Sequence, residues 1–308
     1  MPSIISKLWL KMFYSPYFFT IALRRKNELD TRIPEDFVAD HVIPAGNKKW
    51  VADPMLVDDH GKTYLFYEAV NDGKGRIEVA QVCDDCTISE PVVILEDTCH
   101  YSYPFVFKYD EDWYMIPESS ASNEIRLYKA EAFPEKWKLE TVLLRQNCVD
   151  TTVFEQNENA YLLTYLLCPG TERVVPQAYK LCWEVGHPLL NRISWDTYDE
   201  LECRGAGPLY RNQERLIRPA QKNEEQSYGN GLVFYEVDAD DTGYREKYIA
   251  ELSSRNVSAG KVWMNGLHTY VASERFEAID IRCREFDFWK IPRVLWNRAK
   301  EKTGEKKR

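Results

Sequence analysis

The sequence predicts an all-β protein, a five-bladed β-propeller with four-stranded blades whose N-terminal strand closes the ring. A frame of strand, polar turn and second strand recurs, and its four copies begin at Asp53, Tyr103, Asp150 and Ala206. A second marked position follows each start by fifteen residues, at Glu68, Glu118, Tyr165 and Gln221. The starts are 50, 47 and 56 residues apart. A strand-and-turn repeat of this length is typical of propeller blades.

The expected strands follow in blade order along the chain. The inner turns of the first four blades fall at 58–61, 109–112, 156–159 and 211–214. A fifth, shorter copy starts at 266–270 (GLHTY) and returns along 276–283 (FEAIDIRC). Apolar alternation between turns rich in Gly, Asn and Asp predicts strands on both sides of each turn.

One domain is expected over residues 18–287, because no linker interrupts the blades. The stretch 17–23 (YFFTIAL) is expected to join the last blade as a strand and so to close the ring. Residues 1–17 then form an N-terminal extension, and residues 288–308 form a basic, aromatic tail.

The composition limits the classes of partner and cofactor. A net charge of −9 argues against a nucleic-acid partner. The eight cysteines are scattered, and the one C-x-x-C (Cys83 and Cys86) has no second pair at zinc-finger spacing. The lone D-x-D at Asp238 and Asp240 lies in an acidic turn. We therefore expect reduced thiols, no metal, no cofactor and a cytoplasmic setting.

The two ends of the chain leave two interpretations open. Residues 4–23 are apolar but contain Lys7, Lys11 and Pro16, which argues against a membrane-spanning helix. From Lys290 onward the tail carries eight Lys or Arg against two Glu. It is either a solvated tail or a segment that contacts an anionic membrane surface, and the second interpretation places the protein peripherally at the inner membrane face.

The repeat also predicts a site. Inner strands of a propeller run beside its axis, so equivalent positions meet at one mouth. There we expect four carboxylates, two guanidinium groups, an amide and an imidazole: Asp53, Glu68, Glu118, Asp150, Arg204, Arg218, Gln221 and His268. Flat faces for sugar rings are expected from Trp50, Tyr67, Tyr103 and Tyr228.

Each of these residues also has a purely structural explanation. Asp53 precedes Pro54 and can simply start a turn, and Glu68 and Glu118 can be paired with arginines. Polar side chains that recur at the same two positions of the frame favour a shared pocket instead.

The motifs of this frame resemble a known family. The segments WVADPMLVDDHGKTYLFYE, YPFVFKYDEDWYMIPES, NEIRLYKAEAFPEKWKLE, VDTTVFEQ, RPAQ and GLHTY resemble the N-terminal propeller domain of plant glucosamine inositolphosphorylceramide transferase. That domain is also found in bacterial proteins of surface-polysaccharide gene clusters. The resemblance covers residues 18–285 and implies a carbohydrate-related role.

More distantly, the pattern is similar to five-bladed glycoside hydrolases of the family 43 type. That similarity implies a base at Asp53 and a carboxylate at Asp150 that tunes the pKa of the acid. The acid of those enzymes lies in a Glu-Gly-Pro motif, where this chain reads Ala206-Gly207-Pro208. Glycoside hydrolysis usually needs two carboxyl groups, about 5–5.5 Å or about 6.5–9.5 Å apart. We hypothesise that Glu118, beside apolar residues that raise its pKa, replaces the missing acid.

Two functions remain open, and a third is less favoured. The first is an enzyme that cleaves or transfers a glycosyl unit on a cell-surface polysaccharide or a lipid-linked glycan precursor. Its catalytic residues would be Asp53, Glu118 and Asp150, and its substrate-binding residues would be Trp50, Glu68, Tyr103, Arg204, Arg218, Gln221 and His268. The second is a non-catalytic glycan-binding propeller that positions an acceptor for a partner glycosyltransferase. A protein-interaction propeller rarely needs four carboxylates at its channel.

Overall fold

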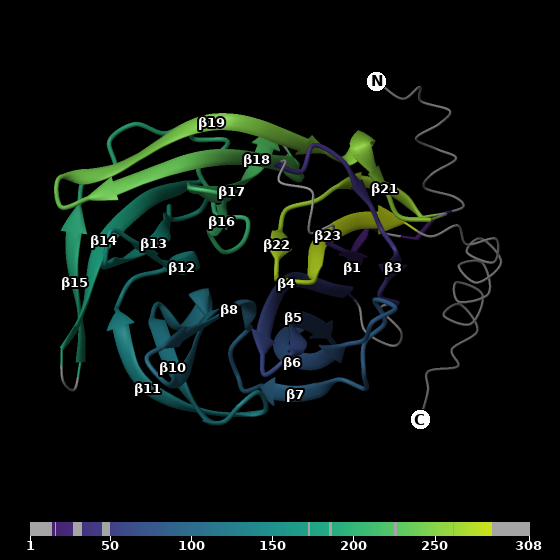
Figure 1. Cartoon of the computed structure of the whole chain (residues 1–308), viewed down its shortest axis with the longest axis horizontal. Coiled ribbons are helices and arrows are strands. Elements are labelled where there is room, and N and C mark those ends of the chain that lie inside the picture. The colour runs from purple at the N-terminus through teal and green to yellow at the C-terminus, as the bar shows by residue number, and fades with distance from the viewer. Residues whose placement is uncertain are drawn as a thin grey trace, which may run out of the picture.

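The computed structural model describes residues 14–15, 17–26, 33–44, 50–171, 173–184, 187–224, 227–260 and 262–284. The predicted five-bladed propeller is confirmed, and Figure 1 shows the blades following one another around a ring. The predicted tail at 288–308 and most of the predicted extension at 1–17 lie outside the described residues. In the part of the chain that is described, no helix is long and apolar enough to cross a membrane.

Each of the first four blades is an antiparallel sheet of four strands in sequence order. The first blade comprises β4 (Trp50–Asp59), β5 (Lys62–Asn71), β6 (Lys74–Val82) and β7 (Val92–Leu95). The second comprises β8 (Ser102–Tyr109), β9 (Asp112–Glu118), β10 (Ile125–Ala132) and β11 (Lys136–Leu144). The third comprises β12 (Cys148–Gln156), β13 (Asn159–Leu167), β14 (Val174–Glu184) and β15 (His187–Ile193). The fourth comprises β16 (Tyr210–Asn212), β17 (Arg215–Glu224), β18 (Ser227–Asp240) and β19 (Gly243–Ser253).

The fifth blade is built from both ends of the described chain. Its inner edge is formed by β21 (Trp263–Gly266) and β22 (Tyr270–Ala272), which both pair with β23 (Phe276–Arg284). The third and fourth strands are β1 (Phe18–Arg25) and β3 (His41–Val42). A short parallel pair of β2 (Phe37–Val38) and β20 (Val257–Ser258) ties the first segment to the chain after the fourth blade.

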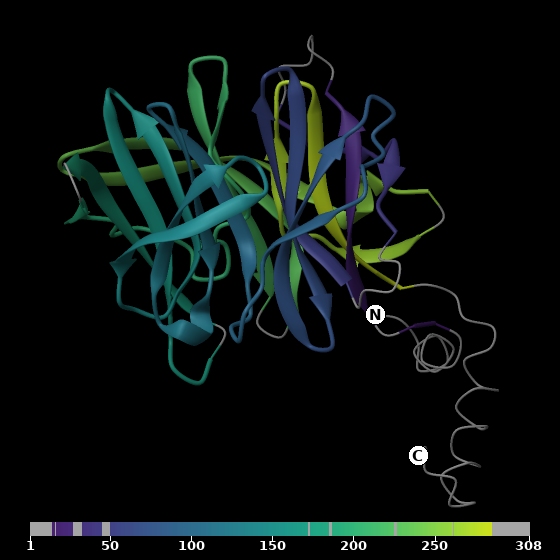
Figure 2. The ribbon, with the colours of Figure 1, turned by 90° about the horizontal axis from the view of Figure 1, so that it is seen from below.

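Closure of the ring rests on the pairing of β1 with β23. The register runs from Phe18 opposite Cys283 to Arg25 opposite Phe276. The centre of β1 is completely buried, so this closure also completes the core of the fifth blade. In Figure 2 the first and fifth blades stand side by side, which brings the start and the end of the ring together.

The first position of the repeated frame has an unusual backbone conformation. Asp53, Tyr103 and Asp150 have φ angles of 52°, 41° and 50°, and each lies at a register shift of its inner strand. Such a β-bulge bends the strand and turns a side chain away from the regular alternation. Asp tolerates this left-handed conformation comparatively well, whereas Tyr is strained there. The recurring aspartate therefore has a conformational reason as well as a chemical one.

The fourth blade departs from the predicted frame by one residue. In the first three blades, Ala52 lies opposite Glu68, Ser102 opposite Glu118 and Val149 opposite Tyr165. In the fourth blade, Gly205 lies opposite Ala220. Gln221 keeps the place of Glu68 and Glu118 on its own strand, six residues after the turn, but the inner strand of the fourth blade has one more bulged residue, so the backbone N–H of Gln221 donates to the carbonyl oxygen of Arg204.

Candidate functional site

A pocket of about 210 Å³ opens at one mouth of the propeller. All five blades contribute to it, and its lining residues are Phe19, Trp50, Ala52, Asp53, Glu68, His100, Ser102, Glu118, Asp150, Arg204, Tyr228 and His268. The structure thus brings together seven of the ten site residues proposed from the sequence: Trp50, Asp53, Glu68, Glu118, Asp150, Arg204 and His268.

The other three lie outside the pocket lining. Arg218 is 1% exposed, and its guanidinium lies 2.7 Å from Glu246 and donates to the Cys203 carbonyl. Gln221 donates to the Gly205 carbonyl oxygen at 2.8 Å. Tyr103 is buried, and its hydroxyl accepts a hydrogen bond from the Gly207 backbone N–H at 3.0 Å. The side chains of Arg218 and Gln221 are thus engaged within the protein, and the Tyr103 hydroxyl is held by Thr152 and by the backbone of Gly207.

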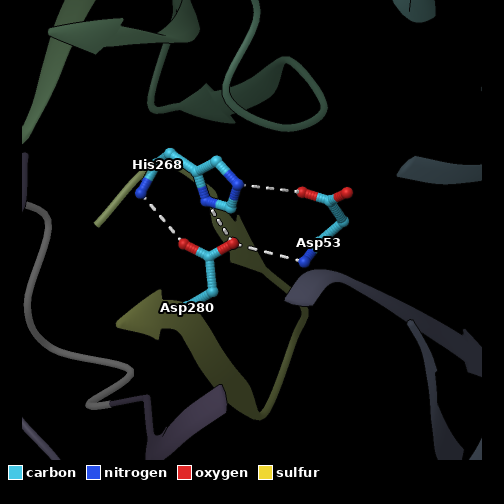
Figure 3. A group of neighbouring side chains, drawn as sticks. All are labelled: Asp53, His268 and Asp280. Atoms are coloured by element: carbon cyan, nitrogen blue, oxygen red, sulfur yellow. Dashed lines mark hydrogen bonds and ion pairs between the residues drawn. The ribbon is translucent and has the colours of Figure 1, made fainter. Parts of the chain in front are cut away.

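The fifth blade places an imidazole between two carboxylates (Figure 3). His268 Nδ1 lies 2.5 Å from Asp280 Oδ2, and His268 Nε2 lies 3.6 Å from Asp53 Oδ1. Asp280 is completely buried and also accepts hydrogen bonds from the backbone N–H groups of Asp53, His268 and Thr269. This carboxylate therefore fixes the orientation of the imidazole and stabilises its protonated form.

The protonation of this group follows from burial and charge. Burial alone would lower the pKa of His268, but the carboxylates of Asp280 and Asp53 raise it to about 9. Burial raises the pKa of Asp53 to about 7, and the facing His268 limits that rise. At neutral pH the imidazole is protonated, and Asp53 exchanges its proton readily.

The same three residues are close enough to be tested as a metal site. One ligand atom from each of Asp53, His268 and Asp280 lies within 4.8 Å of the others. However, the short contact to Asp280 occupies His268 Nδ1, and Nε2 points to the opposite side of the ring, toward Asp53 (Figure 3). A cation held by all three would break this hydrogen-bonded chain, so the arrangement suits proton exchange better than metal binding.

A second group lies across the pocket on the second, third and fourth blades. Arg204 donates from Nε to Asp150, and its Nη2 lies 3.9 Å from Glu118 Oε2. Burial raises the pKa of Glu118 to about 8, the negative charge of Asp150 adds to the rise, and Arg204 opposes it. Glu118 is thus largely protonated at neutral pH, whereas Asp150 is held in an arginine pair.

The third polar group comes from the first blade and the loop after it. Glu68 accepts hydrogen bonds from Trp50 Nε1 at 3.3 Å and from His100 Nε2 at 2.8 Å. The backbone N–H of Gly75 donates to His100 Nδ1 at 3.0 Å, which assigns the ring proton to Nε2. His100 therefore acts as a donor that holds Glu68 at the pocket wall.

The sequence analysis missed several parts of this site. His100 lies outside the repeated frame, and Phe19 comes from β1, where its ring stacks on His268 at 4.4 Å. Tyr228, expected only as a stacking face, contacts His268 edge-on and also lies under the Arg204 guanidinium. Asp280 had a usable signal in the sequence, because it is a carboxylate that stands between two isoleucines, Ile279 and Ile281, in a predicted strand.

Fold and site together define a five-bladed propeller with a carboxylate-rich pocket at one mouth. The chain belongs to the family described as glucosamine inositolphosphorylceramide transferase 1, N-terminal, whose model matches residues 37–271.

Curated plant proteins are among the relatives. Glucosamine inositolphosphorylceramide transferase 1 of Oryza sativa subsp. japonica is 30% identical over 203 residues, which cover 61% of this chain and 26% of the rice protein. The protein of the same name from Arabidopsis thaliana is 38% identical over 117 residues, which cover 37% of this chain and 15% of that protein. The match with the rice protein thus spans about a quarter of its length.

Solved structures with the same fold include two glycoside hydrolases. The catalytic domain of a GH62 α-L-arabinofuranosidase from Coprinopsis cinerea has a TM-score of 0.56 at 10% identity, covering 81% of this chain and 98% of that one. A GH32 β-fructofuranosidase from Bombyx mori has a TM-score of 0.52 at 14% identity, covering 77% of this chain and 62% of that one. At these identities the likeness establishes the fold.

Proposed function

We propose that the mouth pocket binds one glycosyl unit of a cell-surface polysaccharide or a lipid-linked glycan precursor, and that Glu118 and Asp53 cleave or transfer it. The observation that carries this proposal is the pairing of two carboxyl groups with different environments in one pocket. Glu118 is buried beside Asp150 and has a pKa of about 8, so it can donate a proton. Asp53 faces a protonated imidazole that favours its ionised form.

The walls of the pocket suit a sugar. Sugar rings need flat apolar faces for their C–H groups and charged hydrogen-bonding partners for their hydroxyls. Trp50, Phe19 and Tyr228 line the pocket as aromatic faces, while Glu68 and Arg204 supply an acceptor and donors. The volume lies below the roughly 300–1,000 Å³ of sites for drug-sized ligands, which fits a single ring.

The proposed chemistry balances with these residues alone. Glu118 gives its proton to the leaving glycosidic oxygen while the bond from the anomeric carbon to that oxygen breaks. Water, or a hydroxyl of an acceptor, forms the new bond to the anomeric carbon and gives its proton to Asp53. Asp280 keeps His268 oriented toward Asp53, and Arg204 holds Asp150 next to Glu118.

We assign the general acid to Glu118 of the second blade. The position of the glutamate in family 43 enzymes is occupied here by Ala206, which is completely buried in an apolar cluster. The pKa of Glu118, about 8, is above that of Asp53, about 7, and Glu118 is 13% exposed, so it combines a retained proton with access to the pocket.

The names of related proteins support a carbohydrate ligand. The plant relatives are called glucosamine inositolphosphorylceramide transferase 1, and the solved structures of the same fold are titled arabinofuranosidase and β-fructofuranosidase. These names concern those proteins, and they make sugars the first ligands to test.

A non-catalytic glycan-binding pocket is the second candidate. Its specific support is the pair of Asp150 with Arg204, in which the carboxylate is only 4% exposed. This pair removes one carboxylate from direct chemistry. The propeller would then hold an acceptor glycan for a partner glycosyltransferase.

One set of variants separates the two candidates. A glycan array with the full chain identifies the ligand, and hydrolysis or transfer of that ligand is then measured. We expect Glu118→Gln to retain binding but to lose about 10²–10⁴-fold in turnover, and the exposed Glu140→Gln to change neither. Binding without turnover by the unmodified chain would favour the binding module, and no binding to any glycan would reject both.

A further inference from the structure

An aromatic and basic patch lies at one end of the fifth blade, where β21 begins and β23 ends; it consists of Tyr14, Tyr17, Trp263 and Arg284. The rings of Tyr17 and Trp263 stack at 6.1 Å, and Tyr14 contacts Trp263 at 6.4 Å. The guanidinium of Arg284 lies 3.6 Å from the centre of the Tyr17 ring. Neighbouring strands therefore present aromatic rings and a positive charge together.

The exposure of this patch is unusual for the protein. Three aromatic side chains are substantially exposed in the part of the chain that the structure describes: Tyr17 at 41%, Trp263 at 38% and Tyr248 at 50%. Two of the three stack on each other in the patch. Exposed aromatic groups that cluster with arginine are typical of surfaces that meet a membrane interface.

The patch borders the mouth of the pocket. Phe19, two residues after Tyr17, lines the pocket and stacks on His268. Arg282, two residues before Arg284, donates from Nη1 to the backbone oxygen of Tyr228, another lining residue. A flat surface against the patch would therefore lie next to the pocket entrance.

The sequence beyond the patch is strongly basic. Tyr14 and Arg284 are the first and last residues that the structure describes. Residues 1–13 and 285–308 together carry ten Lys or Arg against four Asp or Glu, although the whole chain has a net charge of −9. Positive charge is thus concentrated in the segments joined to the patch, which complements an anionic surface.

We propose that the patch docks on an anionic lipid bilayer and holds the pocket mouth beside the lipid surface. The stacked Tyr17 and Trp263 rings would lie at the headgroup level, and Arg284 would lie against lipid phosphates. A bilayer fits better than a second copy of the chain, because two patches that each carry Arg284 and adjoin basic sequence repel each other, whereas an anionic surface attracts them. The docking surface stands whether or not the pocket is catalytic.

The test is sedimentation of the full chain with vesicles of phosphatidylglycerol and phosphatidylcholine in equal parts, compared with pure phosphatidylcholine. We expect binding to the anionic vesicles only, weakening as salt is added. The double variant Tyr17→Ser, Trp263→Ser should lower the partition coefficient about tenfold, and Arg284→Gln about fivefold. Tyr248→Ser, an exposed aromatic residue on the outer strand of the fourth blade, is the matched control and should bind like the unmodified protein.

Three outcomes would overturn the proposal. The first is failure of the full chain to bind anionic vesicles. The second is binding that both patch variants leave unchanged, which would assign it to another part of the chain. The third is self-association in the ultracentrifuge that the patch variants abolish while vesicle binding stays absent, which would make a second copy the occupant. Thermal unfolding curves show whether a variant that binds less is still folded. If the double variant unfolds, the milder Arg284→Gln still tests the proposal.

Discussion

His268 Nδ1 lies 2.5 Å from the Oδ2 atom of Asp280, and both side chains are buried beneath the mouth of the propeller. Since Asp280 is saturated by backbone N–H groups on its other side, the imidazole keeps its second nitrogen directed at Asp53. The fifth blade therefore acts on the proposed base of the first blade through a fixed imidazole, which makes His268 and Asp280 positioning residues.

Replacing Asp280 tests this arrangement. In Asp280→Asn the amide cannot stabilise an imidazolium, so we expect the pKa of His268 to fall from about 9 toward or below its ordinary value. The free energy of unfolding at pH 7 should drop by about 2–4 kcal/mol, because a buried charge loses its partner. NMR titration of His268 and urea unfolding measure the two effects. Asp72→Asn, at an exposed left-handed turn position that Asn tolerates, should change neither.

The stability of the protein should fall as the pH rises. Asp53, Glu118 and His268 all have pKa values in the folded protein above their ordinary ones, at about 7, about 8 and about 9. The folded state therefore binds more protons than the unfolded state between pH 4 and pH 9, and the slope of the unfolding free energy against pH is negative there. The stabilisation is complete below the ordinary pKa values and is lost as the pH passes through the raised ones. Urea unfolding at a series of pH values checks the slope, and a stability that rises between pH 6 and pH 9 contradicts it.

The proposed cleavage of a glycosidic bond predicts a specific dependence of kcat/KM on pH. The proposed acid works protonated and the proposed base works ionised, so kcat/KM should form a bell with limbs near pH 7 and pH 8. Because the carboxyl groups interact, these limbs describe the coupled group. Asp280→Asn should shift the acid limb upward, since Asp53 then faces a neutral imidazole. A purely structural defect would lower the rate without moving either limb.

The repeat in the sequence was enough to predict the propeller and the meeting of seven polar or aromatic residues at one mouth. It did not predict the additional bulged residue on the inner strand of the fourth blade, which pairs Gly205 with Ala220, nor that the Gln221 amide donates to the Gly205 carbonyl outside the pocket lining. It also overlooked Asp280 and His100, whose importance depends on hydrogen bonds to backbone groups far away in the chain or outside the frame. Spacing predicts which strand ends converge, but bulges decide which way each side chain points.

Gly75 should be required for the geometry of the first blade. A Cβ atom there would lie 2.7 Å from Glu68 Oε1 and 2.8 Å from His100 Nε2, and it would also collide with the Tyr101 backbone oxygen. We expect Gly75→Ala to cost about 1–3 kcal/mol of stability and to weaken ligand binding, because Glu68 and His100 must separate. Gly73→Asn lies in the same hairpin with open space around it, at a left-handed position that Asn tolerates, and is the control. Equal effects of the two changes on binding would contradict the proposed role of this close approach.

Arg204 and Arg218 provide a matched pair that separates the pocket from the scaffold. Arg218→Met removes the partner of buried Glu246, so it should destabilise the protein by about 3–5 kcal/mol. The surviving folded protein should bind its ligand with unchanged affinity, because Arg218 does not line the pocket. Arg204→Met should also lower stability, since Asp150 loses its pair, but it should in addition weaken binding by about tenfold or more through the loss of charged donors at the pocket wall. Calorimetry of ligand binding, read beside urea unfolding of each variant, distinguishes the two roles. If Arg218→Met lost as much affinity as Arg204→Met, Arg218 would contribute to ligand binding, as the sequence analysis expected.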